Sequence, residues 1–242
     1  MWCKVLNEVI RREEPEVRGY VVYPDKALRA PGLILLHSYN QDPNDIEPYA
    51  RKLASRGLVV IVPRYTNLAD GVVECEKAYG ILSRLSQVDP EKIGAMGFSL
   101  GGTVALMSSL KLRLRFIVDC GGWVDLEDLY NYLKNFEAGS PQRIIADTVE
   151  YTLGSPSEAP DLYRKSSPIS YVDMIRVPTL IIHGGKDDFV PVSHSQRLYN
   201  ELVKRGVRVR LRIIEDAGYL LKGFEDEVVR EVLDFLSSEG LI

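Results

Sequence analysis

The sequence predicts an α/β protein built on a doubly wound, mostly parallel sheet. Short apolar runs alternate with longer segments of helical periodicity along most of the 242 residues. The runs at 33–36 and 58–62 are continuously apolar, which is typical of parallel strands buried on both faces. The segments between them carry apolar residues three and four positions apart, as helices that pack on a sheet do. Alternation of this kind places helices on both faces of one sheet.

A hairpin is expected before the first parallel strand. Residues 17–23 are rich in Val and Tyr and alternate in polarity, so we expect a strand that pairs with 5–10 across a polar turn at 11–16. The remaining expected elements are helices at 44–56, 71–85, 103–110, 193–204 and 225–237, and strands at 33–36, 58–62, 114–118, 179–182 and 207–214, with a further strand from 93.

The alternation stops between residues 123 and 170. This stretch has two helical pieces, at 126–136 and 141–153, together with several prolines and tyrosines. We expect a single domain over 1–242 in which about 123–170 form a helical cap insertion over one end of the sheet. Most of the tyrosines should pack the cap on the body, and one or two facing a pocket would favour an apolar or aromatic acyl group.

The composition excludes several classes of function. Apolar residues at 45% and charged residues at 26% are ordinary for a globular domain, and a net charge of −4 gives no reason to expect nucleic acid or an anionic membrane. No apolar run approaches the length of a membrane span. The three cysteines are widely spaced and lack a metal-ligand pattern, so we expect a reducing cytoplasmic location and no metal. The glycines at 94, 97 and 101 do not match a phosphate-binding loop, and no other cofactor is implied.

The most informative stretch is the one around Ser99. Gly97 and Gly101 flank this serine in a Gly-x-Ser-x-Gly pattern, between an apolar strand and an apolar helix. Such a turn is strained, and side chains at the two glycines would collide with the strand and helix. Ser99 Oγ should therefore stand exposed above the sheet, with the N–H of Leu100 directed at the oxyanion of a tetrahedral intermediate.

Two other loops should reach the same edge of the sheet, where the carboxyl ends of the strands lie. One is 37–40, after the strand at 33–36, and the other is 183–191, after the strand at 179–182. The second loop contains Asp187, 88 residues after Ser99, which agrees with the chain order of a Ser, Asp, His triad.

With these motifs the chain resembles the α/β-hydrolases, in particular the dienelactone-hydrolase and prolyl-oligopeptidase-like branches. The resemblance rests on the elbow, on 167–171, and on 177–184 followed by Asp187 and Val190-Pro191. It extends from about residue 17 to residue 237. It implies an α/β-hydrolase fold and a small acyl substrate, such as a carboxylic ester, a thioester or a peptide-like molecule.

The resemblance assigns roles to individual residues. Ser99 would be the nucleophile and Asp187 the acid that orients the base, while Asp188, the competitor, would cap the following turn. The oxyanion hole would use the N–H groups of Leu100 and Tyr39. His37 and His183 would satisfy loop hydrogen bonds, and Ser38 stands where the family often has Gly.

One departure from the family pattern concerns the base. Related hydrolases carry an acidic–Ala–Gly–His stretch after the last strand, whereas this chain reads Glu-Asp-Ala-Gly at 215–218 and then Tyr219. A histidine is about half available as a base at neutral pH, but a phenol is ionised only about one part in a thousand. The difference is roughly 4 kcal/mol before any loss of geometry. An ordinary triad mechanism is therefore disabled.

Three hypotheses account for Tyr219. In the first, the protein is a serine hydrolase that turns over slowly or uses another base. His194 is the nearest candidate for that base, although its spacing favours a packed or capping role. Alternatively it binds a small acyl or aromatic ligand without efficient turnover. The third hypothesis is an engineered variant in which Tyr replaces a natural His.

Overall fold

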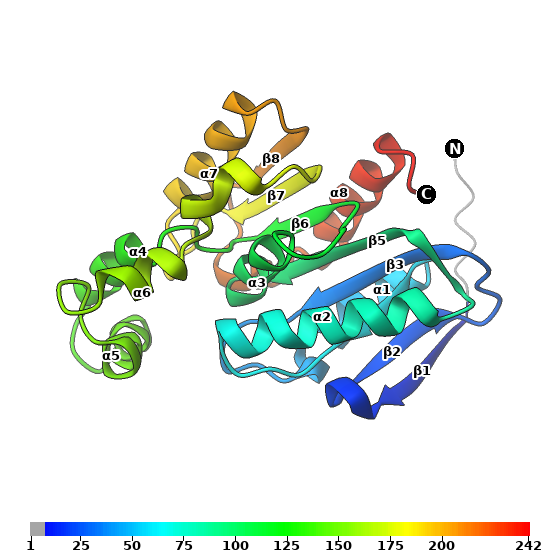
Figure 1. Ribbon diagram of the computed structural model, residues 1–242, viewed down its shortest axis with the longest axis horizontal. Helices are drawn as coiled ribbons and strands as arrows, with labels where there is room; N and C mark the ends of the chain where they lie inside the picture. The colour runs from blue at the N-terminus through cyan, green and yellow to red at the C-terminus, as the bar shows by residue number, and fades with distance from the viewer. Residues whose placement is uncertain (1–7) are drawn as a thin grey trace.

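A computed structural model describes residues 8–242, and its centre is an eight-stranded sheet (Figure 1). The strand order is β1-β2-β4-β3-β5-β6-β7-β8. The strands are β1 (Val9–Glu14), β2 (Gly19–Pro24), β3 (Ala30–Leu36), β4 (Val59–Val62), β5 (Val88–Phe98), β6 (Ile117–Cys120), β7 (Thr179–Gly184) and β8 (Val209–Ile214). β2 is antiparallel to both β1 and β4, and all other neighbours are parallel. The predicted α/β class and mostly parallel sheet are confirmed.

The expected N-terminal hairpin is present with different boundaries. Residues 11–14, expected in a turn, belong to β1, and the connection is a single 3-10 turn, η1 (Pro15–Val17). β1 is an edge strand, and charged side chains are tolerated there because one side of the strand faces solvent. The part of the predicted strand at 5–7 lies outside the described residues.

Helices cover both faces of the sheet, as the strand pattern requires. Their bounds are α1 (Glu47–Ala54), α2 (Leu68–Arg84), α3 (Leu100–Ser108), α4 (Leu126–Lys134), α5 (Pro141–Leu153), α6 (Pro160–Lys165), α7 (Val192–Lys204) and α8 (Glu225–Ser238), with 3-10 turns η2 (Pro43–Ile46), η3 (Pro168–Met174) and η4 (Tyr219–Leu221). Successive residues of a strand point to opposite faces. Ile34 and Leu36 therefore join the core beneath α2, α3 and α7, whereas Leu33 and Leu35 join the core beneath α1 and α8.

Three helices, α4, α5 and α6, lie between β6 and β7 and stand together at one end of the sheet (Figure 1). The bounds of α5 agree with the expected 141–153, and α4 ends two residues before the expected limit. Helix α6 was not predicted, because it has only six residues and buries one side chain, that of Tyr163. This cap of three helices forms one wall of the functional site.

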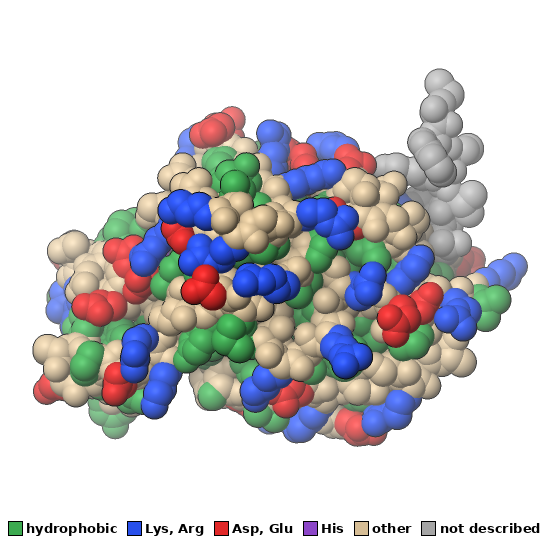
Figure 2. Space-filling view, turned by 45° about the horizontal axis from the view of Figure 1, so that its top comes forward, with side chains coloured by type: hydrophobic (Ala, Val, Ile, Leu, Met, Phe, Trp, Pro, Cys, Tyr) green, Lys and Arg blue, Asp and Glu red, His purple; other side chains and the backbone are tan. Residues whose placement is uncertain are grey.

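The surface carries charges of both signs. On the face in Figure 2, basic and acidic side chains are interspersed over the whole outline. Within residues 8–242, no helix combines the length and the apolar character needed to cross a membrane.

Candidate active site

Ser99 lies at the apex of a strained turn between β5 and α3. Its backbone has φ 50° and ψ −116°, a conformation that L residues avoid unless the surroundings enforce it. A Cβ at Gly97 would lie 2.1 Å from the backbone carbon of Gly101, and one at Gly101 would lie 2.3 Å from the carbonyl oxygen of Leu36. Only glycine allows the helix to approach the strands this closely. The local geometry is that of the nucleophile elbow expected from the sequence.

The loops after β3, β7 and β8 meet at this turn. Tyr219 Oη lies 3.2 Å from Ser99 Oγ and 2.8 Å from Ser38 Oγ, so three hydroxyl groups form a chain. The Ser38 side chain is fully buried. Ser99 is only 7% exposed, so the expectation of an exposed Ser99 was wrong, because the cap covers the elbow. The sequence predicted the meeting of Ser99 and Tyr219. It did not predict the contact with Ser38, because residues 181 positions apart show no local pattern.

The Tyr219 ring is held firmly in place. It stacks on Phe189 with a centroid separation of 4.3 Å and an interplanar angle of 26°. The two residues that follow it, Leu220 and Leu221, both have left-handed backbones, with φ of 62° and 55°. Burial raises the pKa of Tyr219 above its ordinary value of 10.0, although the hydrogen bonds with the two serines oppose the shift. The phenol is therefore neutral at physiological pH and is a poor base.

Asp187 lies on the loop after β7 but is not bonded to Tyr219. Its Oδ1 accepts hydrogen bonds from the N–H groups of Phe189 and Val190, both at 2.9 Å. Its Oδ2 lies 3.6 Å from Nε2 of His183. Burial raises the pKa of Asp187 to about 6, although the two N–H donors oppose the shift. In the described chain the Tyr219 hydroxyl bonds to serines, so the carboxylate does not orient it.

Asp188 has a different role from the expected turn cap. Asp187 is the residue whose carboxylate closes the turn. Asp188 Oδ2 instead accepts a 2.8 Å hydrogen bond from Nε2 of Gln142 in α5. Its carbonyl oxygen accepts a long 3.4 Å bond from the Tyr132 hydroxyl in α4. The loop after β7 is thereby attached to the cap.

The histidines are engaged away from Ser99. His37 Nδ1 donates to the carbonyl oxygen of Ser38 at 2.8 Å, and the ring stacks on Tyr65. His194 is 1% exposed, and its Nδ1 accepts from the N–H of Val124 at 3.3 Å. Burial lowers the pKa of both rings from 6.5. Neither ring lines the cavity described below, so His194 is not placed to serve Ser99 as a base.

A second grouping of Ser, His and Asp lies in the interior. His183 Nε2 donates to the carbonyl oxygen of Val190 at 2.9 Å, which leaves Nδ1 to accept from the Ser195 hydroxyl at 2.6 Å. Asp187 lies beside the same ring. However, His183 and Ser195 are both fully buried, and burial lowers the pKa of His183 to about 4. No substrate can reach Ser195, so this grouping holds the base of the loop rather than performing acyl transfer.

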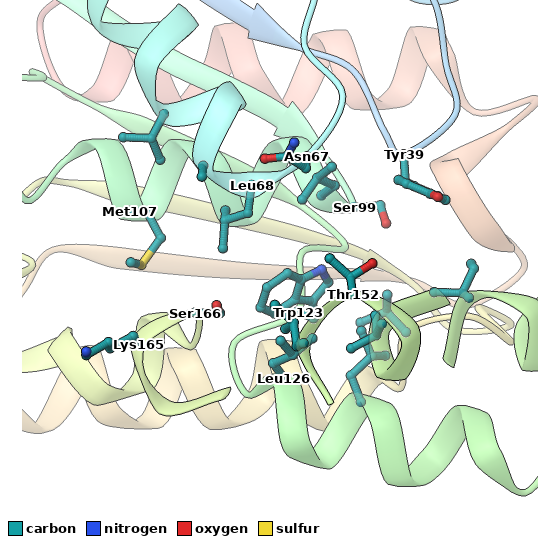
Figure 3. A pocket seen from close by; sticks show the side chains of 18 of the residues that line it. Tyr39, Asn67, Leu68, Ser99, Met107, Trp123, Leu126, Thr152, Lys165 and Ser166 are labelled. Carbon is teal, nitrogen blue, oxygen red and sulfur yellow. The ribbon is translucent and has the colours of Figure 1, made fainter. Parts of the chain in front are cut away.

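The residues expected to supply the oxyanion donors, Leu100 and Tyr39, both lie close to the elbow. Leu100 opens α3, and the first N–H groups of a helix have no acceptor within the helix. Leu100 and Tyr39 line the same cavity as Ser99. Figure 3 shows Tyr39 and Ser99 next to each other at one end of this cavity. Leu100 directly follows Ser99, and Tyr39 lies on the loop after β3, which are the two places where an acyl oxyanion would need N–H donors.

The cavity has a volume of about 690 Å³ and lies between the body and the cap. Ser99, Tyr39 and Tyr219 line one end, and most of the remaining lining is apolar. Trp123, at the start of the cap, lies in its middle (Figure 3). Trp123 and Phe189 were not singled out from the sequence as site residues. Within residues 8–242, no three His, Cys, Asp or Glu side chains lie together as a metal site would require.

Comparison with known proteins identifies the family. The model of the prolyl oligopeptidase family, Peptidase_S9, matches residues 69–239, which include the elbow and the loops of Asp187 and Tyr219. The chain belongs to the prolyl oligopeptidase family. The matched residues include Ser99, Asp187 and Tyr219 but not Ser38 and Tyr39, and the sequence-based family assignment is confirmed.

Three similar proteins illustrate what the chain resembles in sequence and in fold. An uncharacterized peptidase, YtmA, of Bacillus subtilis is 25% identical over 199 residues, 77% of this chain and 74% of YtmA. Inactive dipeptidyl peptidase 10 of Mus musculus is 29% identical over 159 residues, 63% of this chain but only 18% of the mouse protein. A thermophilic esterase of Thermogutta terrifontis, Est2 with butyrate bound, superposes with a TM-score of 0.69 at 19% identity, covering 98% of this chain and 95% of the esterase. The last similarity shows the shared fold.

Proposed function

We propose that the protein is a serine hydrolase that cleaves esters or thioesters of carboxylic acids, with Ser99 as its nucleophile. The observation that carries the proposal is the position of Ser99 Oγ, at a strained turn that opens into a cavity of about 690 Å³. The family assignment and the similarity to an esterase with bound butyrate support the same class of reaction.

In this reaction Ser99 Oγ attacks the acyl carbonyl carbon and breaks the bond to the leaving group. The N–H groups of Leu100 and Tyr39 stabilise the negative charge on the carbonyl oxygen. Water then hydrolyses the acyl-enzyme and releases the acid. Tyr219 donates its proton toward Ser99 Oγ and does not remove one, so the serine proton must leave to solvent.

The missing base limits the rate and the choice of substrate. In serine proteases, binding and the oxyanion hole alone give about 10³–10⁴-fold acceleration over water. An amine leaving group must be protonated as it departs, whereas a thiolate or phenolate departs unaided. We therefore propose that thioesters and aryl esters are hydrolysed slowly, and that amides are not.

A direct test is labelling of the nucleophile. A fluorophosphonate probe should add one phosphonyl group to Ser99, located by peptide mass spectrometry, and p-nitrophenyl butyrate should be hydrolysed slowly. The Ser99→Ala variant should lose both properties, whereas Ser195→Ala should keep them. Labelling of another residue, or ester hydrolysis that survives Ser99→Ala, would contradict the proposal.

Non-hydrolytic binding of an acyl ligand is the second candidate. The hydrogen bond from Tyr219 to Ser99 favours it, because the bond engages a lone pair that the nucleophile needs. The similarity to a dipeptidyl peptidase named inactive supports it as well. A ligand should then raise the melting temperature by mass action and be recovered unchanged. Consumption of that ligand in step with Ser99 acylation would exclude this candidate.

A further inference from the structure

The cavity is long, and it follows helix α3. Ser99 immediately precedes this helix, and Met107 lies in its last turn. With a rise of about 1.5 Å per residue, these two ends of the cavity are about 12 Å apart along the helix. Leu110 lines the cavity beyond Met107. Figure 3 shows the same arrangement, with Ser99 and Tyr39 at one end, Met107 at the other and Trp123 between them.

The walls between the two ends are mostly hydrocarbon, with Asn67, Thr148, Thr152 and Ser166 as further polar members of the lining. The body contributes α3 and the first turns of α2, and the cap contributes one face each of α4 and α5. Six of the apolar side chains that line this length are Val72, Leu126, Leu129, Leu133, Ile145 and Val149. Such a channel favours the binding of an unbranched aliphatic chain, because each methylene that becomes buried leaves water.

Hydrogen-bond donors gather at the Ser99 end. The hydroxyl groups of Ser99 and Tyr219 and the N–H groups of Leu100 and Tyr39 belong to residues that all line this end. A neutral histidine in place of Tyr219 would present an acceptor to Ser99, whereas the phenol presents a donor. The Tyr219 proton is already donated to Ser99 Oγ, so three of these donors remain for a ligand. Three donors suit an oxygen-rich acceptor group, of which a carboxylate is the simplest.

We propose that the cavity binds a medium-chain aliphatic carboxyl compound, with its carboxyl group at Ser99 and its chain along α3 toward Met107. The inference rests on the proposed function only in taking Ser99 as the place of the acyl carbon. It names the class of acid whose ester the hydrolase would cleave, or which a non-hydrolytic protein would hold.

The Met107 end of the cavity also carries charged side chains. A ligand with its carboxyl group at that end would have the opposite orientation. Lys111 and Lys165 line the cavity there, but both side chains are exposed, and Lys111 Nζ already bonds to Glu76 at 2.9 Å. A carboxylate at this end would remain in water and would leave the buried donors at Ser99 without a ligand. The carboxyl group is therefore assigned to the Ser99 end.

Calorimetric titration of the purified protein with butyrate, hexanoate, octanoate, decanoate and dodecanoate tests the inference. The association constant should rise by about fourfold per added methylene until the chain fills the channel, and should then level off. Dodecanol should bind at least tenfold more weakly than dodecanoate. Met107→Trp should shorten the chain at which the rise stops, whereas Met174→Trp, a matched change at an exposed position outside the cavity, should leave the series unchanged.

Affinities independent of chain length would overturn the inference, as would equal binding of the alcohol. Loss of binding in Lys165→Gln would overturn the assigned orientation. Failure here is distinct from failure of the proposed function. Chain-length-dependent binding without any Ser99 labelling would contradict the proposed hydrolase activity and support the proposed ligand class. Ser99 labelling without such binding would support the hydrolase activity and contradict the ligand class.

Discussion

At the residue scale, the two residues that depart from the expected family pattern are in contact with each other. By the resemblance that the sequence shows, Gly is often expected in place of Ser38 and His in place of Tyr219. The hydroxyl oxygens of these two residues are 2.8 Å apart. A lone replacement of His by Tyr would leave a buried phenol without this second partner. The Ser38 hydroxyl thus gives the buried Tyr219 phenol a second hydrogen-bond partner besides Ser99.

The ionisation of Tyr219 provides a prediction. Because burial raises the pKa of this phenol, it should remain neutral at pH values where exposed tyrosines have begun to ionise. Ultraviolet difference titration of the native protein against Tyr219→Phe should show one phenolate that appears only above pH 10. A phenol at position 219 that ionises below pH 9 would contradict the environment described here.

At the element scale, the elbow requires close approach of α3 to β3 and β5. Gly101→Ala would place a Cβ 2.3 Å from a backbone oxygen that cannot move aside, so we expect a loss of at least about 3 kcal/mol in the free energy of unfolding. Gly80→Ala in α2 is the matched control, since its Cβ would meet nothing closer than 4.0 Å. It should gain about 0.5–1 kcal/mol through helix propensity.

Urea denaturation measures both changes. Opposite signs for the two glycine-to-alanine substitutions are the expected result. A Gly101→Ala variant as stable as the wild type would show that the turn has room for a side chain, and the geometry assigned to Ser99 would then be wrong.

Some elements could be predicted from the sequence because their signals are local. The limits of α5 follow from Ser140, whose hydroxyl caps the first turn, from Pro141 at the first position and from Gly154 at the end. Helix α6 has one buried side chain in six residues, too few for a periodicity. Helix α2 begins three residues before the expected residue 71, because its Asn67 cap lies before the apolar pattern begins.

The features of the site also fall into those that the sequence could predict and those that it could not. Ser99, Asp187 and Tyr219 could be named because each belongs to a motif with fixed spacing. The bond of Tyr219 to Ser38, the stacking on Phe189 and the attachment of Asp188 to Gln142 could not be named. They depend on how distant loops meet, which periodicity and spacing do not encode.

At the scale of the whole molecule, the core contains an unused carboxyl group beneath the elbow. Asp119 in β6 is fully buried; its Oδ1 accepts from the N–H of Gly122 at 2.9 Å, and its Oδ2 has no partner among the described residues. Desolvation raises the pKa of Asp119 to about 7. Between about pH 4 and 7 the folded state therefore binds a proton that the unfolded state has lost.

This difference makes the stability fall as the pH rises through that window. A shift from 3.8 to about 7 corresponds to roughly 4 kcal/mol, lost progressively and complete above pH 7. Asp119→Asn keeps the acceptor for Gly122 and removes the titration. The free energy of unfolding, measured from pH 4.5 to 8, should increase in the variant relative to the wild type as the pH rises. Parallel curves would mean that Asp119 does not titrate in this window.

The most direct measurement compares kcat/KM for p-nitrophenyl butyrate in the wild type, Tyr219→His and Tyr219→His with Asp187→Asn. Because a general base contributes about 10²–10⁴-fold, Tyr219→His should raise kcat/KM by at least about a hundredfold. Adding Asp187→Asn should remove most of that gain, since the acid holds the imidazole in its productive tautomer. A folded Tyr219→His variant with unchanged kcat/KM would contradict the account of Ser99 as a nucleophile that lacks only its base.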